Sequence, residues 1–197
     1  MTNTRMIRYM MFFLVLLYIF VSPFLWPPLV FSQEYRIFDY FSTETNPEAK
    51  AYLKSVDTYH TNKVMNWIHN KNYDAALSDL QFALKRFPNH PKALMLIVTY
   101  AHFTNSPNMA MPYYERAIKL FPQHAITYAQ YGTYLVDIGI VQIGIERLKK
   151  AIEINPKLSI AYKWLSEAYI KKGDIELARK TIEKAKELGL NVQDSSK

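Results

Sequence analysis

The side chains best suited to chemistry in this 197-residue chain are five histidines, which no cysteine accompanies. A zinc site on one helix face needs two ligands four residues apart, whereas His60 and His69 are nine apart (69 − 60 = 9). His90 and His124 each stand directly before an expected helix start, which indicates a repeated structural feature of a loop. The sequence therefore predicts no metal site.

Other groups that could react have no partner in the sequence. Ser106 and Asp137 stand alone, and no nucleophile elbow, glycine-rich phosphate loop or carboxylate pair can be identified. The absence of cysteine also excludes a thiolate nucleophile and a disulfide. We therefore expect no catalytic residue, no cofactor and no enzymatic activity.

The net charge of +7 comes from 24 Lys and Arg against 17 Asp and Glu. A nucleic-acid-binding protein would gather its basic residues into one patch, but here acids and bases alternate. The pattern is clearest among Lys149, Lys150, Lys171, Lys172, Arg179 and Lys180, which interleave with Glu146, Glu153, Glu167, Asp174, Glu176 and Glu183. This distribution is typical of solvated helix surfaces, and we expect no nucleic-acid partner.

The elements that position these residues recur with a fixed period. Pro88, Pro122 and Pro156 are 34 residues apart (122 − 88 = 34; 156 − 122 = 34), which indicates a solenoid of repeated helix pairs. Small residues recur with the same spacing and would let paired helices approach closely. They are Ala76, Ala110, Gly144 and Ala178, and Ala83, Ala117, Ala151 and Ala185.

In this register the sequence resembles the tetratricopeptide repeat family, most clearly at Ala161–Tyr169 followed by Gly173. The first unit departs most, with His60 and Lys63 where an aromatic residue and Leu are usual. The resemblance implies an all-α, right-handed solenoid of about four helix pairs that binds other proteins. The expected repeats are 57–90, 91–124, 125–158 and 159–190, within a solenoid that spans 47–190.

The family register also implies a protein-binding groove along the first helices of the pairs. Thr61 and Met65 occupy places where a carboxylate-binding clamp would need Lys and Asn, so that form of recognition is not expected. The strip is instead apolar and contains methionine, which suits an extended peptide or an amphipathic helix. The expected groove residues are Met65, Ile68, His69, Met95, Thr99, His102, Phe103, Ile126, Thr133 and Val136.

Several positions predict where helices begin and end. Asn46–Pro47–Glu48 combines a cap, a first-turn proline and an acidic residue, so the first helix is expected to start near Pro47 and to reach about Asn70. Pro107 and Pro112 predict a late start or a kink in the second helix of the second pair. Gly139 and Gly173 are expected in tight turns.

Residues 1–32 are predicted to enter a membrane. An apolar run from Tyr9 to Phe31 follows Arg5 and Arg8, which favours a retained single-pass anchor with a cytoplasmic N-terminus. The solenoid would then lie in the periplasm or outside the cell. The alternative is a signal peptide whose removal leaves Gln33 as the first residue.

Residues 33–46 form an aromatic linker, and residues 191–197 a polar tail. The linker could cover the apolar groove, or its aromatic side chains could lie at the membrane surface. The predicted function is a membrane-tethered scaffold or adaptor that helps to assemble or organise a cell-envelope complex. The alternative is a permanent accessory or regulatory subunit of a membrane-bound enzyme.

Overall fold

The computed structural model describes residues 35–190. The predicted membrane segment at 1–32 and the polar tail at 191–197 lie outside the described residues. Within the described part, no helix is both long and apolar enough to cross a membrane. Residues 36–190 belong to one compact unit, to which the following description applies.

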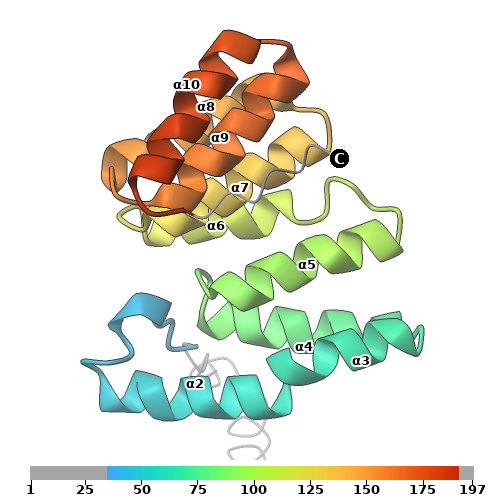
Figure 1. Ribbon diagram of the computed structural model, residues 1–197. Helices are drawn as coiled ribbons and strands as arrows, with labels where there is room; N and C mark the ends of the chain where they lie inside the picture. Colours follow the sequence, from blue (N-terminus) through green and yellow to red (C-terminus); the bar gives the residue numbers. More distant parts are fainter. Residues whose placement is uncertain (1–34, 191–197) are drawn as a thin grey trace, which may run out of the picture. The chain divides into compact units, whose positions relative to one another are not determined.

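Within residues 35–190 the regular secondary structure is entirely helical, which confirms the predicted fold class at this level. Successive helices stack on one another from α2 to α10 (Figure 1). The first helices α5, α7 and α9 begin 34 residues apart (125 − 91 = 34; 159 − 125 = 34). The helices from α4 onward are α4 (Tyr73–Arg86), α5 (Pro91–Phe103), α6 (Met111–Leu120), α7 (Ala125–Asp137), α8 (Val141–Ile154), α9 (Ser159–Lys172) and α10 (Ile175–Glu187).

The N-terminal helical region starts as expected but is interrupted. Helix α2 (Pro47–Tyr59) is capped by Asn46, whose side chain accepts a hydrogen bond from the amide of Ala49 at 3.0 Å. The expected continuous run to Asn70 is wrong, because a 3₁₀ turn, η2 (Thr61–Lys63), separates α2 from α3 (Val64–His69).

A long-range contact holds the chain at this break. The imidazole Nδ1 of His60 lies 2.7 Å from an Asp79 carboxylate oxygen, and the ring stacks on Phe82 with centroids 4.1 Å apart. The backbone of His60 leaves helical geometry at φ −123° and ψ −74°. Partners on α4, about twenty residues along the chain, thus fix a geometry that local sequence does not reveal.

The second pair is irregular at the expected place. Helices α4, α8 and α10 begin at Tyr73, Val141 and Ile175, so the 34-residue spacing predicts a start at 107 for α6 (73 + 34 = 107). Helix α6 begins at Met111, four residues later (111 − 107 = 4), with Pro112 in its first turn. Pro107 stays in the preceding loop, which confirms the predicted late start.

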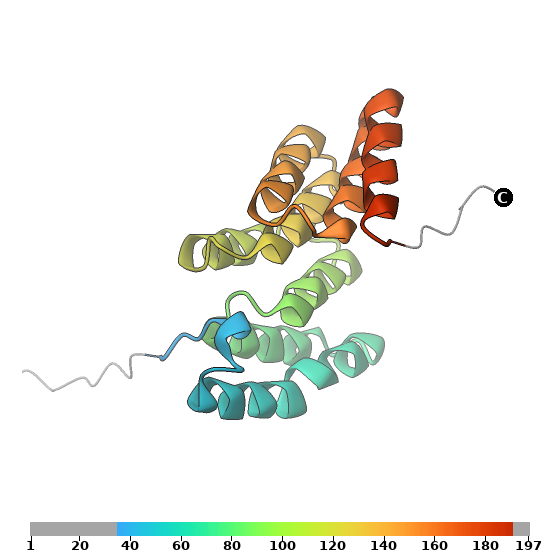
Figure 2. The same ribbon diagram turned by 60° about the vertical axis from the view of Figure 1, so that its left-hand side comes forward.

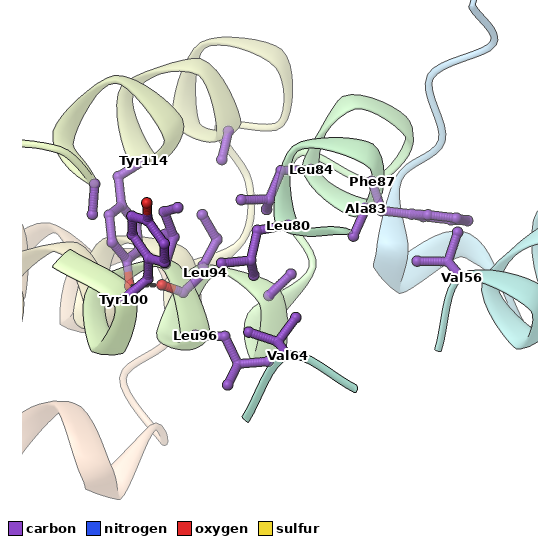
Figure 3. Packing of buried hydrophobic residues seen from close by; sticks show 14 of the residues in the cluster. Val56, Val64, Leu80, Ala83, Leu84, Phe87, Leu94, Leu96, Tyr100 and Tyr114 are labelled. Carbon is purple, nitrogen blue, oxygen red and sulfur yellow. Dashed lines mark hydrogen bonds between the residues drawn. The ribbon is translucent and has the colours of Figure 1, made fainter. Parts of the chain in front are cut away.

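The core consists of two clusters of buried apolar side chains, and α7 contributes to both. Figure 3 shows part of the first cluster, in which Leu80, Leu84 and Leu94 pack between α4 and α5. The small residues of the two repeated rows are all buried, as their proposed role in helix approach requires. They are Ala76, Ala83, Ala110, Ala117, Gly144, Ala151, Ala178 and Ala185.

The turns within successive pairs share one left-handed residue. Gly139 and Gly173 have φ of 91° and 92°, and a Cβ at either would meet nothing within 4 Å, so backbone geometry alone favours glycine there. The same place is held by Lys71 (φ 56°) and Asn105 (φ 51°), each 34 residues from the next (71, 105, 139, 173). For lysine, this left-handed backbone conformation costs roughly 1–2 kcal/mol of conformational free energy.

Replacing Lys71 by glycine should therefore stabilise the protein by about 0.5–1 kcal/mol, after deducting the greater chain entropy of glycine in the unfolded state. Urea unfolding would measure the change. Lys119→Gly within α6 is the control with opposite sign, since it should cost about 1 kcal/mol. A loss of stability in Lys71→Gly would contradict this account of the turn.

Candidate protein-binding face

The exposed surface of α3, α5, α7 and α9, called here the first-helix face, is rich in apolar side chains. Met65, Met95, Phe103 and Ile170 expose 40%, 56%, 55% and 57% of their surfaces. They come from α3, α5 and α9, which are separate layers of the stack. Large apolar residues exposed on neighbouring helices are typical of a surface that another molecule covers.

Helix α5 provides the longest apolar stripe on this face. Met95, Thr99 and Phe103 are spaced by four residues, so they lie above one another on one side of the helix. His102 is also exposed, and His69 is exposed on α3. The stripe presents an apolar ridge, and the imidazole-bearing His102 precedes Phe103 at its end.

A hollow of about 200 Å³ lies between α5, α7 and α9 on this face. Its wall includes three expected groove residues, Met95, Thr99 and Thr133, and its floor consists of the almost fully buried Tyr114 and Tyr134. The lining residues are Met95, Val98, Thr99, Tyr114, Gln130, Thr133, Tyr134, Asp137 and Trp164.

The hydroxyl groups around this hollow already have acceptors within the protein. Tyr114 donates to the carbonyl of Leu94 at 3.2 Å, and Tyr134 donates to the carbonyl of Pro107. Thr99 and Thr133 each donate to a carbonyl of their own helix at 3.2 Å. The hollow therefore offers mainly apolar surface to an incoming group.

Burial of the tyrosines supports the interpretation that the hollow is mainly apolar, because it keeps their hydroxyl groups neutral. Removal from water raises the pKa of Tyr114 far above the ordinary value, so its phenol stays neutral. Burial also raises the pKa of Tyr134, the other tyrosine of the floor. The aromatic floor is uncharged over the whole physiological range.

Three of the expected groove residues lie elsewhere. Ile68 is 1% exposed within the first core cluster, and Val136 is 6% exposed under the close approach of α8 at Gly144. Neither can contact a partner, so both belong to the core and leave the groove set. Ile126 is half-buried beside His124 and Leu158, at a second hollow near the turns between repeats.

Trp164 and Val98 line the hollow but were not among the expected groove residues. Trp164 is one repeat beyond Gln130 (130 + 34 = 164), and both line the hollow. Extending each expected groove position along its 34-residue row would have found Asp137, one repeat beyond Phe103 (103 + 34 = 137), but not Trp164, whose row contains no expected groove residue. Val98 lies beside Thr99 and needed the observed rotation of α5 to be recognised.

Three histidines form pairs with aspartates that join the N-terminal elements to the repeats. His60 contacts Asp79 at 2.7 Å, and Nε2 of His90 contacts Asp57 at 3.0 Å. A third pair joins His124 to Asp39 at 2.8 Å. Among residues 35–190 no group of three His, Asp or Glu side chains could hold a metal ion. These histidines act as structural hydrogen-bonding groups.

His90 should make the stability of the fold depend on pH. Its ring is 2% exposed, its Nδ1 accepts from the amide of Ala93 at 3.4 Å, and its Nε2–H donates to Asp57. Burial lowers its pKa, although Asp57 opposes this effect. The pKa of His90 in the folded state is therefore below its unfolded value of about 6.5. The stability that neutral His90 contributes to the fold is complete above that pH and is lost as the pH falls below it.

Urea midpoints measured between pH 7 and pH 5 should therefore decline less in His90→Asn than in the parent chain. Asparagine can still cap α5 but does not titrate. His69→Asn, at an exposed position, should leave the parent pH dependence unchanged. Equal declines in the parent and His90→Asn would exclude His90 as the source.

The arrangement of helices corresponds to known repeat proteins. A family model for the tetratricopeptide repeat matches residues 91–124 and 161–188. The chain contains tetratricopeptide repeats. No curated protein sequence matches the chain.

Solved structures support the tetratricopeptide fold at low sequence identity. A structure of MamA 41-end from Desulfovibrio magneticus RS-1 is 23% identical, with a TM-score of 0.51 over 68% of this chain and 76% of that chain. A structure described as a functional characterization of Pseudomonas aeruginosa pilF is 20% identical, with a TM-score of 0.55 over 71% of this chain and 63% of that one. At these identities the likeness concerns the fold of the repeats.

Proposed function

We propose that this chain is a membrane-tethered tetratricopeptide scaffold whose first-helix face binds another protein. The observation that carries this proposal is the exposure of Met65, Met95, Phe103 and Ile170 on α3, α5 and α9, together with a mainly apolar hollow that Met95 helps to line. Such a surface suits the apolar side of an amphipathic helix or an extended peptide. The proposal assigns the chain no catalytic activity.

The chemistry of the hollow supports an apolar anchor from the partner. Its hydroxyl groups are already bonded internally, so apart from the side chains of Gln130 and Asp137 the lining offers an incoming group mainly apolar contact. Its volume of about 200 Å³ is suited to one large side chain. Affinity should therefore depend on one or two apolar residues of the partner.

The membrane tether and the location rest on the N-terminal sequence. The apolar run from Tyr9 to Phe31, preceded by Arg5 and Arg8, supports an anchor with the repeats in the periplasm or outside the cell. A scaffold at that place would help to assemble or organise a cell-envelope complex. Intact mass spectrometry of the mature protein tests the tether, since a chain that begins at Gln33 would exclude it.

A second candidate is a permanent accessory subunit of a membrane-bound enzyme. It is favoured by apolar residues exposed away from the first-helix face, such as Ile143, Ile175 and Leu177, at 46%, 62% and 45%. A permanent subunit should aggregate when purified without its enzyme, whereas an adaptor should stay soluble in mild detergent.

Site-specific photo-crosslinking in native membranes tests the binding face. A photoreactive residue at Met95 should capture a specific protein, and one at Lys180 on the outer face of α10 is the control. Capture from Lys180 with none from Met95 would show that the partner uses another surface. Mass spectrometry of the captured protein would identify the complex.

A further inference from the structure

Residues 36–46, called here the strap, lie along the turns that join successive repeats (Figure 2). The amide of Phe38 donates to the carbonyl of Arg86 at 2.8 Å, and the amide of Tyr40 donates to the side chain of Asn89 at 2.9 Å. The strap thus neither covers the first-helix face nor stays free. Of the two alternatives left open by the sequence, this position argues against the one in which the linker covers the groove.

Aromatic side chains hold the strap at two consecutive turns. Phe38 is 7% exposed and stacks on Phe87, with ring centroids 5.5 Å apart. At the next turn Phe41 lies against the ring of His124 at 4.4 Å. The strap therefore spans both ends of the second repeat.

Between these aromatic contacts, the carboxylate of Asp39 binds both turns at once. Its Oδ1 accepts from Asn89 at 2.7 Å, on the turn that leads into α5. Its Oδ2 accepts from His124 at 2.8 Å and from Gln123 at 3.3 Å, on the turn that leads into α7. One carboxylate thus bridges the turns at the two ends of repeat 91–124.

The environment of Asp39 keeps this carboxylate ionised. Burial alone would raise its pKa, but hydrogen bonds from Asn89, His124 and the amide of Phe41 outweigh that effect and lower it. Hydrogen bonds to an ionised acceptor are about twice as strong as those between neutral groups. Asn89 is fully buried, so loss of Asp39 would also leave its amide group without this partner.

We propose that Asp39 acts as a staple that holds the starting ends of α5 and α7 together and so fixes the shape of the hollow between them. The second repeat needs such a restraint, because α6 starts four residues late (111 − 107 = 4). Helices α5 and α7 supply most of the lining of the hollow, including Met95 and Thr133. A change in their separation would alter the binding face directly.

The third turn of the solenoid lacks the two side-chain types that bind Asp39 at the second turn. The residues equivalent to Gln123 and His124 are Lys157 and Leu158 (123 + 34 = 157; 124 + 34 = 158). Neither provides the planar amide or imidazole that the carboxylate uses at the second turn. The restraint is thereby confined to the irregular repeat.

The distance between two spin labels measures the proposed effect in the full-length chain, whose lack of cysteine permits clean labelling. Labels at Asn66→Cys on α3 and Glu167→Cys on α9 lie at exposed positions on either side of the second and third repeats. We expect a narrow distance distribution in the parent protein and a wider, shifted one in Asp39→Ala. The measurement needs no partner, so its outcome is independent of the proposed binding function.

Asp39→Asn provides a variant of equal shape that retains an acceptor for Asn89 but replaces Oδ2 by a donor facing His124. It too should widen the distribution while leaving the helical circular dichroism unchanged. The matched control is Glu44→Gln, which removes an exposed carboxylate of the strap that pairs with exposed Lys50 at 2.8 Å. An unchanged distribution in Asp39→Asn would overturn the proposal, even if Asp39→Ala failed to fold.

Discussion

Replacing Gly144 by alanine should destabilise the protein by about 2 kcal/mol, because the added methyl group has no room between α7 and α8. A Cβ at Gly144 would lie 2.6 Å from Val136 Cγ2 and 2.7 Å from the carbonyl oxygen of Gly132. A backbone oxygen cannot rotate away as a side chain can. The two helices would have to separate along their buried interface.

The expected loss is a net value. Alanine favours a helix over glycine by about 1 kcal/mol, so the steric cost must exceed that gain. Gln142→Ala on the exposed side of α8 is the control within the same helix, and it should change stability little. Urea unfolding of both variants tests the effect. Equal midpoints would mean that α7 and α8 separate easily, contrary to their close packing at Gly132 and Gly144.

This glycine pair shows what the sequence could and could not reveal about packing. The 34-residue rows predicted that Gly144 faces another helix, since the equivalent residues are Ala76, Ala110 and Ala178. They did not reveal why this repeat has glycine where the others have alanine. The reason is Gly132 on the facing helix, a contact that depends on the distance between helices.

Backbone effects that act within a few residues could also be predicted. Pro107 and Pro112 predicted the late start of α6. Proline lacks a backbone amide donor, and a helix tolerates this loss only in its first turn. The break after Tyr59 was missed, since it depends on the contacts of His60 with Asp79 and Phe82. Contacts between distant residues were the recurrent source of error.

The strap illustrates the same limit for the candidate site. Its aromatic residues indicated that the segment would pack against something, but the choice between groove, membrane surface and turns depended on Asn89 and His124. Likewise Ile68 and Val136 occupy groove positions in the family register, yet neighbouring helices cover both. Register gives the side of a helix, whereas burial depends on the exact approach of its neighbours.

Truncating Phe103 to alanine should weaken binding of the partner by about 2 kcal/mol, or roughly 30-fold in Kd, if it is a central anchor of the first-helix face. Phe103 is 55% exposed at the end of the stripe that also contains Met95 and Thr99. A substitution so exposed should change folding stability by no more than about 0.5 kcal/mol. The loss of affinity can therefore be assigned to the interface. Calorimetric titration with the partner identified by photo-crosslinking would measure this loss.

The matched control for Phe103→Ala is Ile175→Ala, which removes a similarly exposed apolar side chain from α10, outside the first-helix face. Lys180→Ala on the same helix removes an exposed charge that pairs with Glu176. Both should bind the partner as the parent does, because neither lies near the hollow between α5, α7 and α9. Normal binding by Phe103→Ala, together with loss of binding in Ile175→Ala or Lys180→Ala, would move the binding surface to the outer helices.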